Sequence, residues 1–462
     1  MKRTLADFAA ACGGRLHGAD AEFAAVTIDT RRLAAGDLFL ALPGAHADGH
    51  DHVPAAAAAA AAGAVVTRRL TLDLPQIVVA DVATALAAVA GVWREQFAIP
   101  VIGVAGSNGK STVKEMLSTI LQRAGGCLAT AGNYNNHLGV PLTLLRLSEK
   151  HRSAVVEIGA NHAGEVAALA ALVRPTIGVV TNAGAEHLEG FGDLEGAARA
   201  EGELFAALGP HSVAVINHDD RYAAMWRGMT RARVVSFGTT TGASVRGTEI
   251  RHGVDERGFI TYFNIESRGG NVSAELTLAG RHNVLNALAA ATAALAAGAT
   301  LTDIVSGLRE VRAMAGRMQF RRTSGGAWLI DDSYNANPTS ALAAIQVLAE
   351  LPARKWLVLG DMAELGEHGA ASHRDIGRAA RERGVERLYS FGALAALAAE
   401  EFRSGAEGQQ QAFCFDDSEA LARELAQQLR PDVCLLVKGS RVNRLERLVA
   451  SLGAAPVARK AS

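Results

Sequence analysis

The sequence predicts an α/β protein of three domains, and two observations support this. The chain has 462 residues, which is more than a single hydrophobic core usually serves. Short apolar segments typical of buried parallel strands alternate with segments of helical spacing, and this alternation restarts near residue 315. Because 49% of the residues are hydrophobic and only 5% are aromatic, we expect cores of alanine, leucine and valine, with helices packed on sheets.

The first predicted domain covers residues 1–82 and is a small α/β unit. A helix is expected over residues 4–11. Alternating apolar residues predict strands around Asp29-Thr30-Arg31, and two further short strands are expected at AVVT and QIVVA. Helical spacing over residues 81–97 predicts a helix that connects this domain to the next one.

The second predicted domain covers residues 83–314 and contains a mainly parallel sheet with helices on both faces. Its near-continuous apolar strands are VIGVAG, AVVEIGA and TIGVVTNAG, with helices expected over 112–124 and 164–173. Three loops that leave these strands, 106–112, 157–162 and 181–191, carry polar residues. Ligands of such sheets bind at the carboxyl ends of the strands, so we expect the three loops to form one site. The period-two segment 232–279 is interpreted as a strand-rich insertion.

The third predicted domain covers residues 315–462 and is a separately wound, Rossmann-like α/β unit. Its strands are expected at AWLIDDS, KWLVLGD, RLYSFG, AFCFDD and VCLLVKGS, each followed by a helical or polar segment. The final residues, AAPVARKAS, have the composition of a loose tail.

Charge and cysteine content exclude several classes of protein. A net charge of −1 gives no support for nucleic-acid binding, which normally needs a basic surface. The four cysteines lie far apart, which favours neither a zinc site nor disulfides and fits a reducing compartment. No signal peptide is expected at the N-terminus. The alanine-rich runs at 55–62 and 286–297 are interpreted as buried helices rather than membrane spans. These features predict a cytoplasmic protein without membrane insertion.

The most informative segment is IPVIGVAGSNGKSTV, residues 99–113. A strand, a glycine-rich turn and a helix beginning near Lys110 would direct backbone N–H groups at a bound phosphate. Lys110 would reach the terminal phosphates, and the Ser111 hydroxyl would contact Mg²⁺. The segment departs from the usual motif at Val104, where the motif has its first glycine. The alternative to a phosphate-binding loop is an ordinary glycine-rich turn that happens to precede a lysine. The predicted phosphate loop consists of Gly106, Ser107, Asn108, Gly109, Lys110, Ser111 and Thr112.

Polar residues on the neighbouring loops extend this prediction. Glu157 ends the strand AVVEIGA, where a carboxylate suits Mg²⁺, although it could also simply solvate a strand end. A single histidine is more often a core or surface residue than a metal ligand. His187 lies on the third loop of the same sheet edge, and this position favours a ligand. Nearby, Asn182 would either hold its loop or contact substrate. Asn135 and Asn136 belong to an asparagine cluster for which a structural turn competes with ligand binding.

Together these motifs resemble the Mur ligases, and the combination is most similar to the branch that adds D-alanyl-D-alanine. The likeness spans nearly the whole chain. The segments that carry it, in chain order, are GSNGKST, GNYNNHLGVP, VVEIGANHAGE, TNAGAEHLEGFG, GRHNVLNALAA, DDSYNANPTS, GDMAELGEHG and KGSR.

The resemblance implies an N-terminal domain that binds a UDP-sugar, a central ATPase and a C-terminal domain that closes over the nucleotide. It implies that Ser111, Glu157 and His187 hold Mg²⁺, with two ions expected, and that Thr30 and Arg31 face the UDP portion. It further implies that His282 and Asn283 meet the adenine. Nucleotide contacts from the C-terminal domain are implied for Arg317 and Asp332, and also for Lys438 and Arg441.

One residue departs from the family pattern. Mur ligases usually have a carbamylated lysine fourteen residues after this histidine, but position 201 is a glutamate. We hypothesise that Glu201 supplies the negative charge to the second Mg²⁺ directly. The glutamate side chain is three bonds shorter than a carbamylated lysine, so Glu201 would contact the ion through water or after a backbone shift. The alternative is that Glu201 only solvates a helix.

The resemblance implies an enzyme that uses ATP to join a UDP-N-acetylmuramoyl-tripeptide to D-alanyl-D-alanine through an acyl phosphate. We expect a monomer, although no sequence feature determines the oligomeric state. The nearest alternative is another amide ligase of the superfamily, such as a different Mur ligase or a folylpolyglutamate synthetase. A nucleotide-binding scaffold that has lost catalysis is an alternative of another class, and a nucleic-acid motor is disfavoured by the balanced charge.

Overall fold

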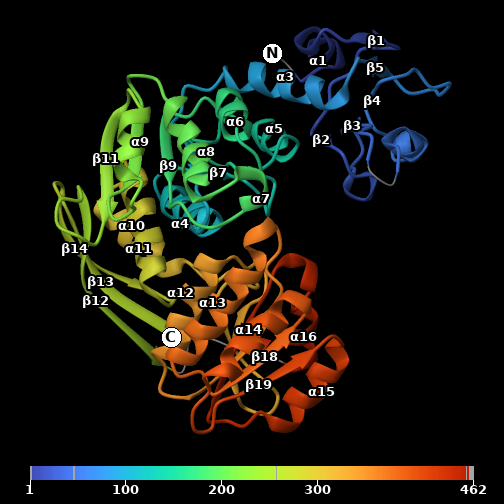
Figure 1. Ribbon diagram of the computed structural model, residues 1–462. Helices are drawn as coiled ribbons and strands as arrows, with labels where there is room; N and C mark the ends of the chain where they lie inside the picture. Colours follow the sequence, from blue (N-terminus) through green and yellow to red (C-terminus); the bar gives the residue numbers. More distant parts are fainter. Residues whose placement is uncertain (1–2, 45–46, 256–257, 454, 457–462) are drawn as a thin grey trace.

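The computed structural model describes residues 3–44, 47–255, 258–453 and 455–456. Its strands form three sheets that follow one another along the chain, each with its own helices. Figure 1 shows three units along the chain. The N-terminal unit (blue) and the C-terminal unit (orange to red) each adjoin the central unit (cyan to yellow). The predicted α/β class with three units and a central parallel sheet is confirmed.

The N-terminal sheet has the strand order β1-β5-β4-β3-β2, with β1 antiparallel and the others parallel. Thr4 caps the first helix because its hydroxyl accepts the N–H of Asp7. The elements are α1 (Leu5–Cys12), β1 (Arg15–His17), β2 (Val26–Thr27), η1 (Thr30–Arg32), β3 (Leu38–Leu40), η2 (Gly49–His52), α2 (Val53–Ala58), β4 (Gly63–Val66), β5 (Gln76–Val78) and α3 (Val82–Arg94).

One prediction in this unit is wrong. The alanine-rich run 55–62 does not form a buried helix, because helix α2 ends at Ala58 and only Ala56 of the run is buried. Only Val53 and Ala56 of this helix are buried. Alanine favours a helix but contributes little apolar surface, so the run remains helical only where these two side chains meet the sheet.

The central sheet has nine strands in the order β14-β13-β12-β11-β10-β9-β6-β8-β7. The strands from β7 to β12 pair in parallel, and β12, β13 and β14 pair antiparallel. The segment 232–279 is therefore not an insertion. It continues the sheet, because β11 pairs directly with β10. The strands are β6 (Val101–Ala105), β7 (Cys127–Ala129), β8 (Ser153–Glu157), β9 (Ile177–Val180), β10 (Val213–Asn217), β11 (Arg233–Gly238), β12 (Val245–Asp255), β13 (Gly258–Ser267) and β14 (Gly270–Leu276).

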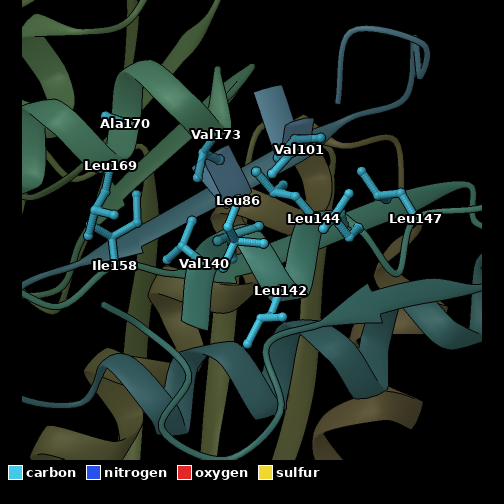
Figure 2. Close-up of a cluster of buried hydrophobic side chains, with 14 of the residues drawn as sticks. Leu86, Val101, Val140, Leu142, Leu144, Leu147, Ile158, Leu169, Ala170 and Val173 are labelled. Atoms are coloured by element: carbon cyan, nitrogen blue, oxygen red, sulfur yellow. The ribbon is translucent and has the colours of Figure 1, made fainter. Parts of the chain in front are cut away.

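Helices cover both faces of the parallel part of this sheet, so its strands are apolar throughout. Alternate residues of β6 enter different cores: Val101 lies in one cluster and Ile102 in the other. Figure 2 shows the first cluster, in which Leu86 of the connecting helix α3 packs against Val140 and Leu144. The helices are α4 (Lys110–Arg123), α5 (Gly139–Leu144), α6 (Glu165–Val173), α7 (Leu188–Phe191), α8 (Leu194–Ala206), α9 (Ala223–Met229), α10 (Arg281–Ala296) and α11 (Leu301–Glu310).

The second alanine-rich run is buried, as predicted. It belongs to helix α10, which packs against α4 at the centre of the second cluster. Small alanine side chains let these two helices approach closely. Helix α4 begins at the predicted phosphate loop, and Gly109 just before it lies against Asn286 of α10, so α10 packs directly beside the loop. None of the helices within the described ranges is long and apolar enough to cross a membrane.

The C-terminal sheet has the order β19-β18-β17-β20-β16-β15-β21, parallel from β19 to β16 and antiparallel at β15 and β21. Each of the five predicted strands is present. The elements are β15 (Gln319–Arg322), β16 (Trp328–Asp332), α12 (Pro338–Ala349), β17 (Arg354–Gly360), η3 (Gly366–His368), α13 (Gly369–Glu382), β18 (Arg387–Phe391), α14 (Ala393–Ser404), β19 (Gln411–Phe415), α15 (Ser418–Gln428), β20 (Val433–Lys438), η4 (Arg441–Asn443), α16 (Glu446–Ser451) and β21 (Ala455–Pro456).

Candidate active site

The phosphate loop joins strand β6 to helix α4 and needs glycine at two positions. Gly106 has φ +118°, and a Cβ there would lie 2.2 Å from the hydroxyl oxygen of Thr181. Gly109 has φ +88°, and a Cβ there would lie 2.3 Å from Oδ1 of Asn286. Both conformations are left-handed, and both positions lack room for a side chain. The turn can therefore bring its backbone N–H groups close to an anion.

Lys110 is the first residue of helix α4, and its ammonium group points back at the loop. Lys110 Nζ donates to the carbonyl of Gly106 at 2.6 Å and contacts Glu186 Oε1 at 3.2 Å. Burial acts to lower the pKa of Lys110, but the charges of Glu186, Glu201 and Glu157 outweigh it and raise this pKa. Burial likewise acts to raise the pKa of Glu186, and Lys110 together with His187 holds it below its usual value. Lys110 is thus a fixed positive charge beside the loop.

Glu157 ends strand β8 next to this lysine and is only 2% exposed. Its Oε1 accepts hydrogen bonds from Ser111 Oγ at 3.1 Å and from Asn135 Nδ2 at 2.9 Å. Its Oε2 is buried and has no hydrogen-bond partner among the described residues. A buried anionic oxygen without a donor is costly unless a cation or solvent meets it. Ser111 and Glu157 are therefore suited to a hard divalent cation such as Mg²⁺.

The protein alone does not complete such a metal site. Among the residues that the structure describes, no group of three or more His, Cys, Asp or Glu side chains is arranged to hold a metal ion. Mg²⁺ is commonly held by one or two carboxylates together with phosphate oxygens of a substrate. One carboxylate oxygen beside a phosphate loop fits that arrangement, in which the nucleotide supplies the missing ligands.

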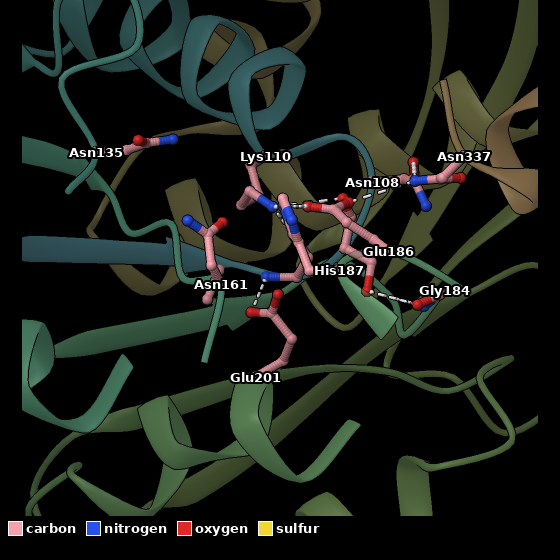
Figure 3. A network of polar contacts seen from close by, with 12 residues as sticks. Asn108, Lys110, Asn135, Asn161, Gly184, Glu186, His187, Glu201 and Asn337 are labelled. Atoms are coloured by element: carbon pink, nitrogen blue, oxygen red, sulfur yellow. Dashed lines mark hydrogen bonds and ion pairs between the residues drawn. The ribbon is translucent and has the colours of Figure 1, made fainter. Parts of the chain in front are cut away.

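His187 lies on the third predicted loop, immediately before α7, with a left-handed backbone at φ +50°. Its Nε2 is 3.1 Å from Glu186 Oε1, and its Nδ1 is 2.5 Å from Glu364 Oε2. Burial acts to lower the pKa of His187, but the two carboxylates prevail and raise it. Figure 3 shows Lys110, Glu186 and His187 gathered at one point. The three loops therefore meet as predicted.

The asparagines have different roles. Asn182 uses both ends of its amide on the backbone of Asn108, accepting its N–H at 3.1 Å and donating to its carbonyl at 2.8 Å. Of its two predicted roles, this geometry favours holding the loop. Asn136 Oδ1 accepts the N–H groups of Leu138 and Gly139, which is a turn-forming role. Asn135 instead reaches Glu157, so within the cluster it is the residue that contacts the candidate metal ligand.

Glu201 approaches the loop from helix α8. It is 3% exposed, and its Oε2 accepts the N–H of Gly106 at 2.6 Å. Figure 3 shows this carboxylate directed at the loop backbone. Glu201 does not line the cavity described below. Burial raises its pKa to about 7, in spite of the opposing charge of Lys110. The arrangement supports the loop, and in this position Glu201 does not reach the cavity.

A cavity of about 890 Å³ lies between the central and C-terminal units and brings most of the predicted site together. His282 and Asn283, at the start of α10, line it, and burial lowers the pKa of His282 to about 4, so its ring is neutral. Asp332 accepts a 2.6 Å hydrogen bond from Lys438 Nζ at the ends of β16 and β20. The predicted residues that line the cavity are Ser107, Asn108, Gly109, Lys110, Ser111, Thr112, Asn135, Asn136, Glu157, Asn182, His187, His282, Asn283, Arg317, Asp332 and Lys438.

Several predicted residues lie outside this cavity. Gly106 is at the base of the loop, and Arg441 is exposed near the ring of Tyr334, with Arg317 4.2 Å from the same ring. Thr30 and Arg31 form η1 in the N-terminal unit, where Arg31 pairs with Asp29. The next residue, Arg32, donates to the hydroxyl of Tyr134 at 3.1 Å, and Tyr134 precedes the cavity-lining Asn135.

Three contacting residues were not singled out from the sequence. Glu186 joins Lys110 to His187, and Asn337 donates to Asn108 Oδ1 at 2.9 Å and contacts Glu186 at 3.4 Å. Glu364 reaches His187 from the C-terminal unit. Glu186 precedes a predicted site residue, Asn337 lies in the DDSYNANPTS segment and Glu364 in the GDMAELGEHG segment, so all three were within recognised motifs. No local pattern indicates which partner each one finds.

Three family models match successive parts of the chain. They are described as Mur ligase family, catalytic domain (residues 22–94), Mur ligase middle domain (residues 104–294) and Mur ligase, glutamate ligase domain (residues 316–441). Each match falls on one of the three sheets. The matched residues include the phosphate loop, Glu157 and His187 in the middle domain, and Arg317, Asp332 and Lys438 in the last one.

Similar proteins cover almost the whole chain. The UDP-N-acetylmuramoyl-tripeptide–D-alanyl-D-alanine ligase of Escherichia coli is 41% identical over 97% of this chain and 98% of its own length. A crystal structure of MurF from Acinetobacter baumannii matches with a TM-score of 0.88 and 35% identity over 97% of this chain and 98% of that one. MurF from Thermotoga maritima in complex with ADP has a TM-score of 0.81 and 26% identity, covering 93% and 96%. This protein belongs to the Mur ligase family.

Proposed function

We propose that this protein is an ATP-dependent ligase that joins the terminal carboxylate of a UDP-N-acetylmuramoyl-tripeptide to the amine of D-alanyl-D-alanine. The observation that carries the proposal is the meeting of Lys110, Glu157 and His187 at the carboxyl ends of neighbouring strands, on one cavity between two domains. The full-length similarity to ligases named for this reaction supports the choice of substrates. We retain residues 1–82, 83–314 and 315–462 as the proposed domain boundaries.

The reaction we propose has two steps. First, an oxygen of the tripeptide carboxylate attacks the γ-phosphorus of ATP, and ADP leaves. Second, the amine of D-alanyl-D-alanine attacks the acyl carbon, an amide bond forms, and inorganic phosphate leaves with the oxygen that was in the carboxylate. Lys110 would stabilise the charge on the transferring group, and the loop N–H groups would orient it. The enclosure between domains would keep water from the acyl phosphate.

We propose that Ser111, Glu157 and His187 hold Mg²⁺ together with phosphate oxygens. The ion would neutralise charge on the β- and γ-phosphates when it is bound. The unpartnered Oε2 of Glu157 supports one such ion. For the second ion we retain the hypothesis that Glu201 supplies the negative charge, through water or after a backbone shift, because its carboxylate does not line the cavity. Strong restoration of activity by bicarbonate, in buffer stripped of CO₂, would contradict that direct role.

The remaining residues are proposed as substrate contacts. His282 and Asn283 would meet the adenine, where a neutral imidazole suits an uncharged base. Arg317, Asp332 and Lys438 would contact the rest of the nucleotide, with Arg441 at the edge of the site. Thr30 and Arg31 would face the UDP portion. Asn135, Asn136 and Asn182 are retained as proposed substrate residues, of which Asn135 is the most direct because it touches Glu157.

The experiment that tests the function is product analysis by mass spectrometry. Purified protein with ATP, Mg²⁺, UDP-tripeptide and D-alanyl-D-alanine should give the UDP-pentapeptide and ADP in equal amounts. Omission of either the UDP-tripeptide or the D-alanyl-D-alanine should stop ADP release. Glutamate or diaminopimelate as sole acceptor should give no product, which separates this function from other amide ligases. ADP release without any peptide product would refute the proposal. We also propose that the protein acts as a monomer in the cytoplasm.

A further inference from the structure

We propose that Glu364, from the C-terminal domain, is a positioning residue for His187. It holds Nδ1 of the ring and so leaves Nε2 directed at the cavity for the metal ion. The inference rests on the proposed function, because it concerns the same metal and nucleotide site. It adds that the site is completed by a residue of another domain, and only while that domain is docked.

The contacts of His187 distinguish the two sides of its ring. Nδ1 lies 2.5 Å from Glu364 Oε2, whereas Nε2 faces Glu186 Oε1 at 3.1 Å. Glu186 and His187 line the cavity, and Glu364 does not. Nε2 is therefore on the cavity side and Nδ1 on the side of the C-terminal domain. A carboxylate on one nitrogen of a metal-binding histidine fixes the tautomer and the orientation of the other nitrogen.

The position of Glu364 is determined by its own domain. It lies in the loop that follows β17, with a left-handed backbone at φ +61°. On one side of it, the N–H of Met362 donates to Nε2 of the buried His373 at 2.9 Å, and the N–H of Ala363 donates to Ser440 Oγ at 2.7 Å. The loop is thus fixed to the C-terminal sheet, and Glu364 moves with that domain.

Additional contacts show that the C-terminal domain is docked at this point of the molecule. The carbonyl of Glu364 accepts the N–H of Glu189 at 3.3 Å, beside His187. Asn337 bonds to Asn108 of the phosphate loop, and Thr339 Oγ1 accepts the N–H of Ala185. If the C-terminal domain moved away, Glu364 would leave His187 while Lys110, Glu157 and His187 stayed on the central domain. The metal ligand would then lose its orientation.

The expected size of the effect follows from exposure. Removal of a residue that orients a metal ligand typically lowers metal affinity about 10- to 100-fold. The Glu364 side chain is 57% exposed, and exposed ionic contacts are screened by water, so we expect the lower end of that range, about tenfold.

The test measures metal affinity rather than turnover. Binding of Mn²⁺, used in place of Mg²⁺, is followed by electron paramagnetic resonance in the presence of a nonhydrolysable ATP analogue. Glu364→Ala should weaken Mn²⁺ binding about tenfold. Glu367→Ala is the matched control, because Glu367 is an exposed acid of the adjacent η3 and no contact between it and His187 is present in the described structure; it should bind Mn²⁺ as the wild type does. Equal affinities of the wild type and Glu364→Ala, or equal losses in both variants, overturn the proposal.

A second measurement distinguishes positioning from a general structural effect. The ¹⁵N chemical shifts of His187, observed by NMR in ¹⁵N-histidine-labelled protein, are sensitive to the hydrogen-bond partner of each ring nitrogen. The Nδ1 resonance should move in Glu364→Ala, which removes the carboxylate beside Nδ1, and should keep its wild-type position in Glu367→Ala; an unmoved Nδ1 resonance in Glu364→Ala overturns the proposal. His187→Ala separates the two claims. If His187→Ala loses Mn²⁺ affinity and Glu364→Ala does not, only the positioning role fails. If the wild type binds no Mn²⁺ with nucleotide, the proposed function fails.

Discussion

Replacement of Glu157 with glutamine separates the chemical role of this carboxylate from its structural role. Glutamine has nearly the same shape, so its carbonyl oxygen can accept the hydrogen bonds that Ser111 and Asn135 donate to Glu157. The amide nitrogen then takes the place of the oxygen that has no hydrogen-bond partner in the described structure. The substitution therefore keeps the local bonds and removes only the negative charge.

The ligand-free protein should lose little unfolding free energy. An unpartnered buried amide nitrogen costs about 1–3 kcal/mol, and the charged oxygen that it replaces costs at least as much, so the variant should be destabilised by no more than about 2 kcal/mol. Breaking a bonded buried ion pair would instead cost about 3–5 kcal/mol. Stability without ligand should thus be nearly retained in Glu157→Gln.

The stabilisation by ligand should be lost. A ligand at one hundred times its dissociation constant adds about 2.7 kcal/mol to the free energy of unfolding. We expect this gain in the wild type with Mg²⁺ and a nonhydrolysable ATP analogue, and little of it in Glu157→Gln. Urea unfolding with and without ligand measures both quantities. The reasoning is refuted if the variant keeps the full Mg²⁺-dependent gain, or if its ligand-free form loses more than about 3 kcal/mol.

Three further predictions follow from the phosphate loop and its surroundings. Lys110→Ala should lower the rate of ADP release about 100- to 1,000-fold, because it removes the fixed charge at the transferring phosphate; wild-type release would exclude the assigned role. Gly109→Ala should lower stability by at least about 1 kcal/mol, since alanine at a left-handed φ is strained and its Cβ would meet Asn286; an unchanged urea midpoint would contradict this. Glu201→Gln should flatten the pH dependence of unfolding in metal-free protein. Folding raises the pKa of Glu201 from 4.5 to about 7, so its stabilising protonated form is fully present below pH 4.5 and is lost as pH rises through 7, about 3 kcal/mol in all. Urea unfolding at pH 5 and pH 8 compares the two proteins, and the same pH dependence in both would count against this role of Glu201.

The sequence was sufficient to predict where the central site lies, for a physical reason. Glu157 and His187 follow apolar strands that pair with the strand before the phosphate loop, and the carboxyl ends of parallel neighbours share one edge of the sheet. The type of each residue and its position at a strand end were therefore enough to predict that Glu157 and His187 lie near the phosphate loop. The direction of each side chain was not determined, since Asn136 forms a turn while Asn135 beside it contacts Glu157.

The contacts between domains could not be predicted from the sequence. Glu364 and Asn337 lie more than 140 residues from the residues they meet, and nothing in their local sequence encodes how two domains dock. The segment 232–279 was misjudged for a related reason. Its period-two pattern indicates strands, but pairing with β10, and hence continuation of the central sheet, is a tertiary choice. The run 55–62 shows that helix-forming composition does not establish burial.

The most direct test of the account follows one oxygen atom through the reaction. UDP-tripeptide labelled with ¹⁸O in its terminal carboxylate is incubated with ATP, Mg²⁺ and D-alanyl-D-alanine, and the released phosphate is analysed by mass spectrometry. If the carboxylate attacks the γ-phosphorus at Lys110, each phosphate formed from fully labelled substrate should carry one ¹⁸O, and the pentapeptide should retain the other. Phosphate without ¹⁸O would contradict phosphoryl transfer to the carboxylate in this cavity.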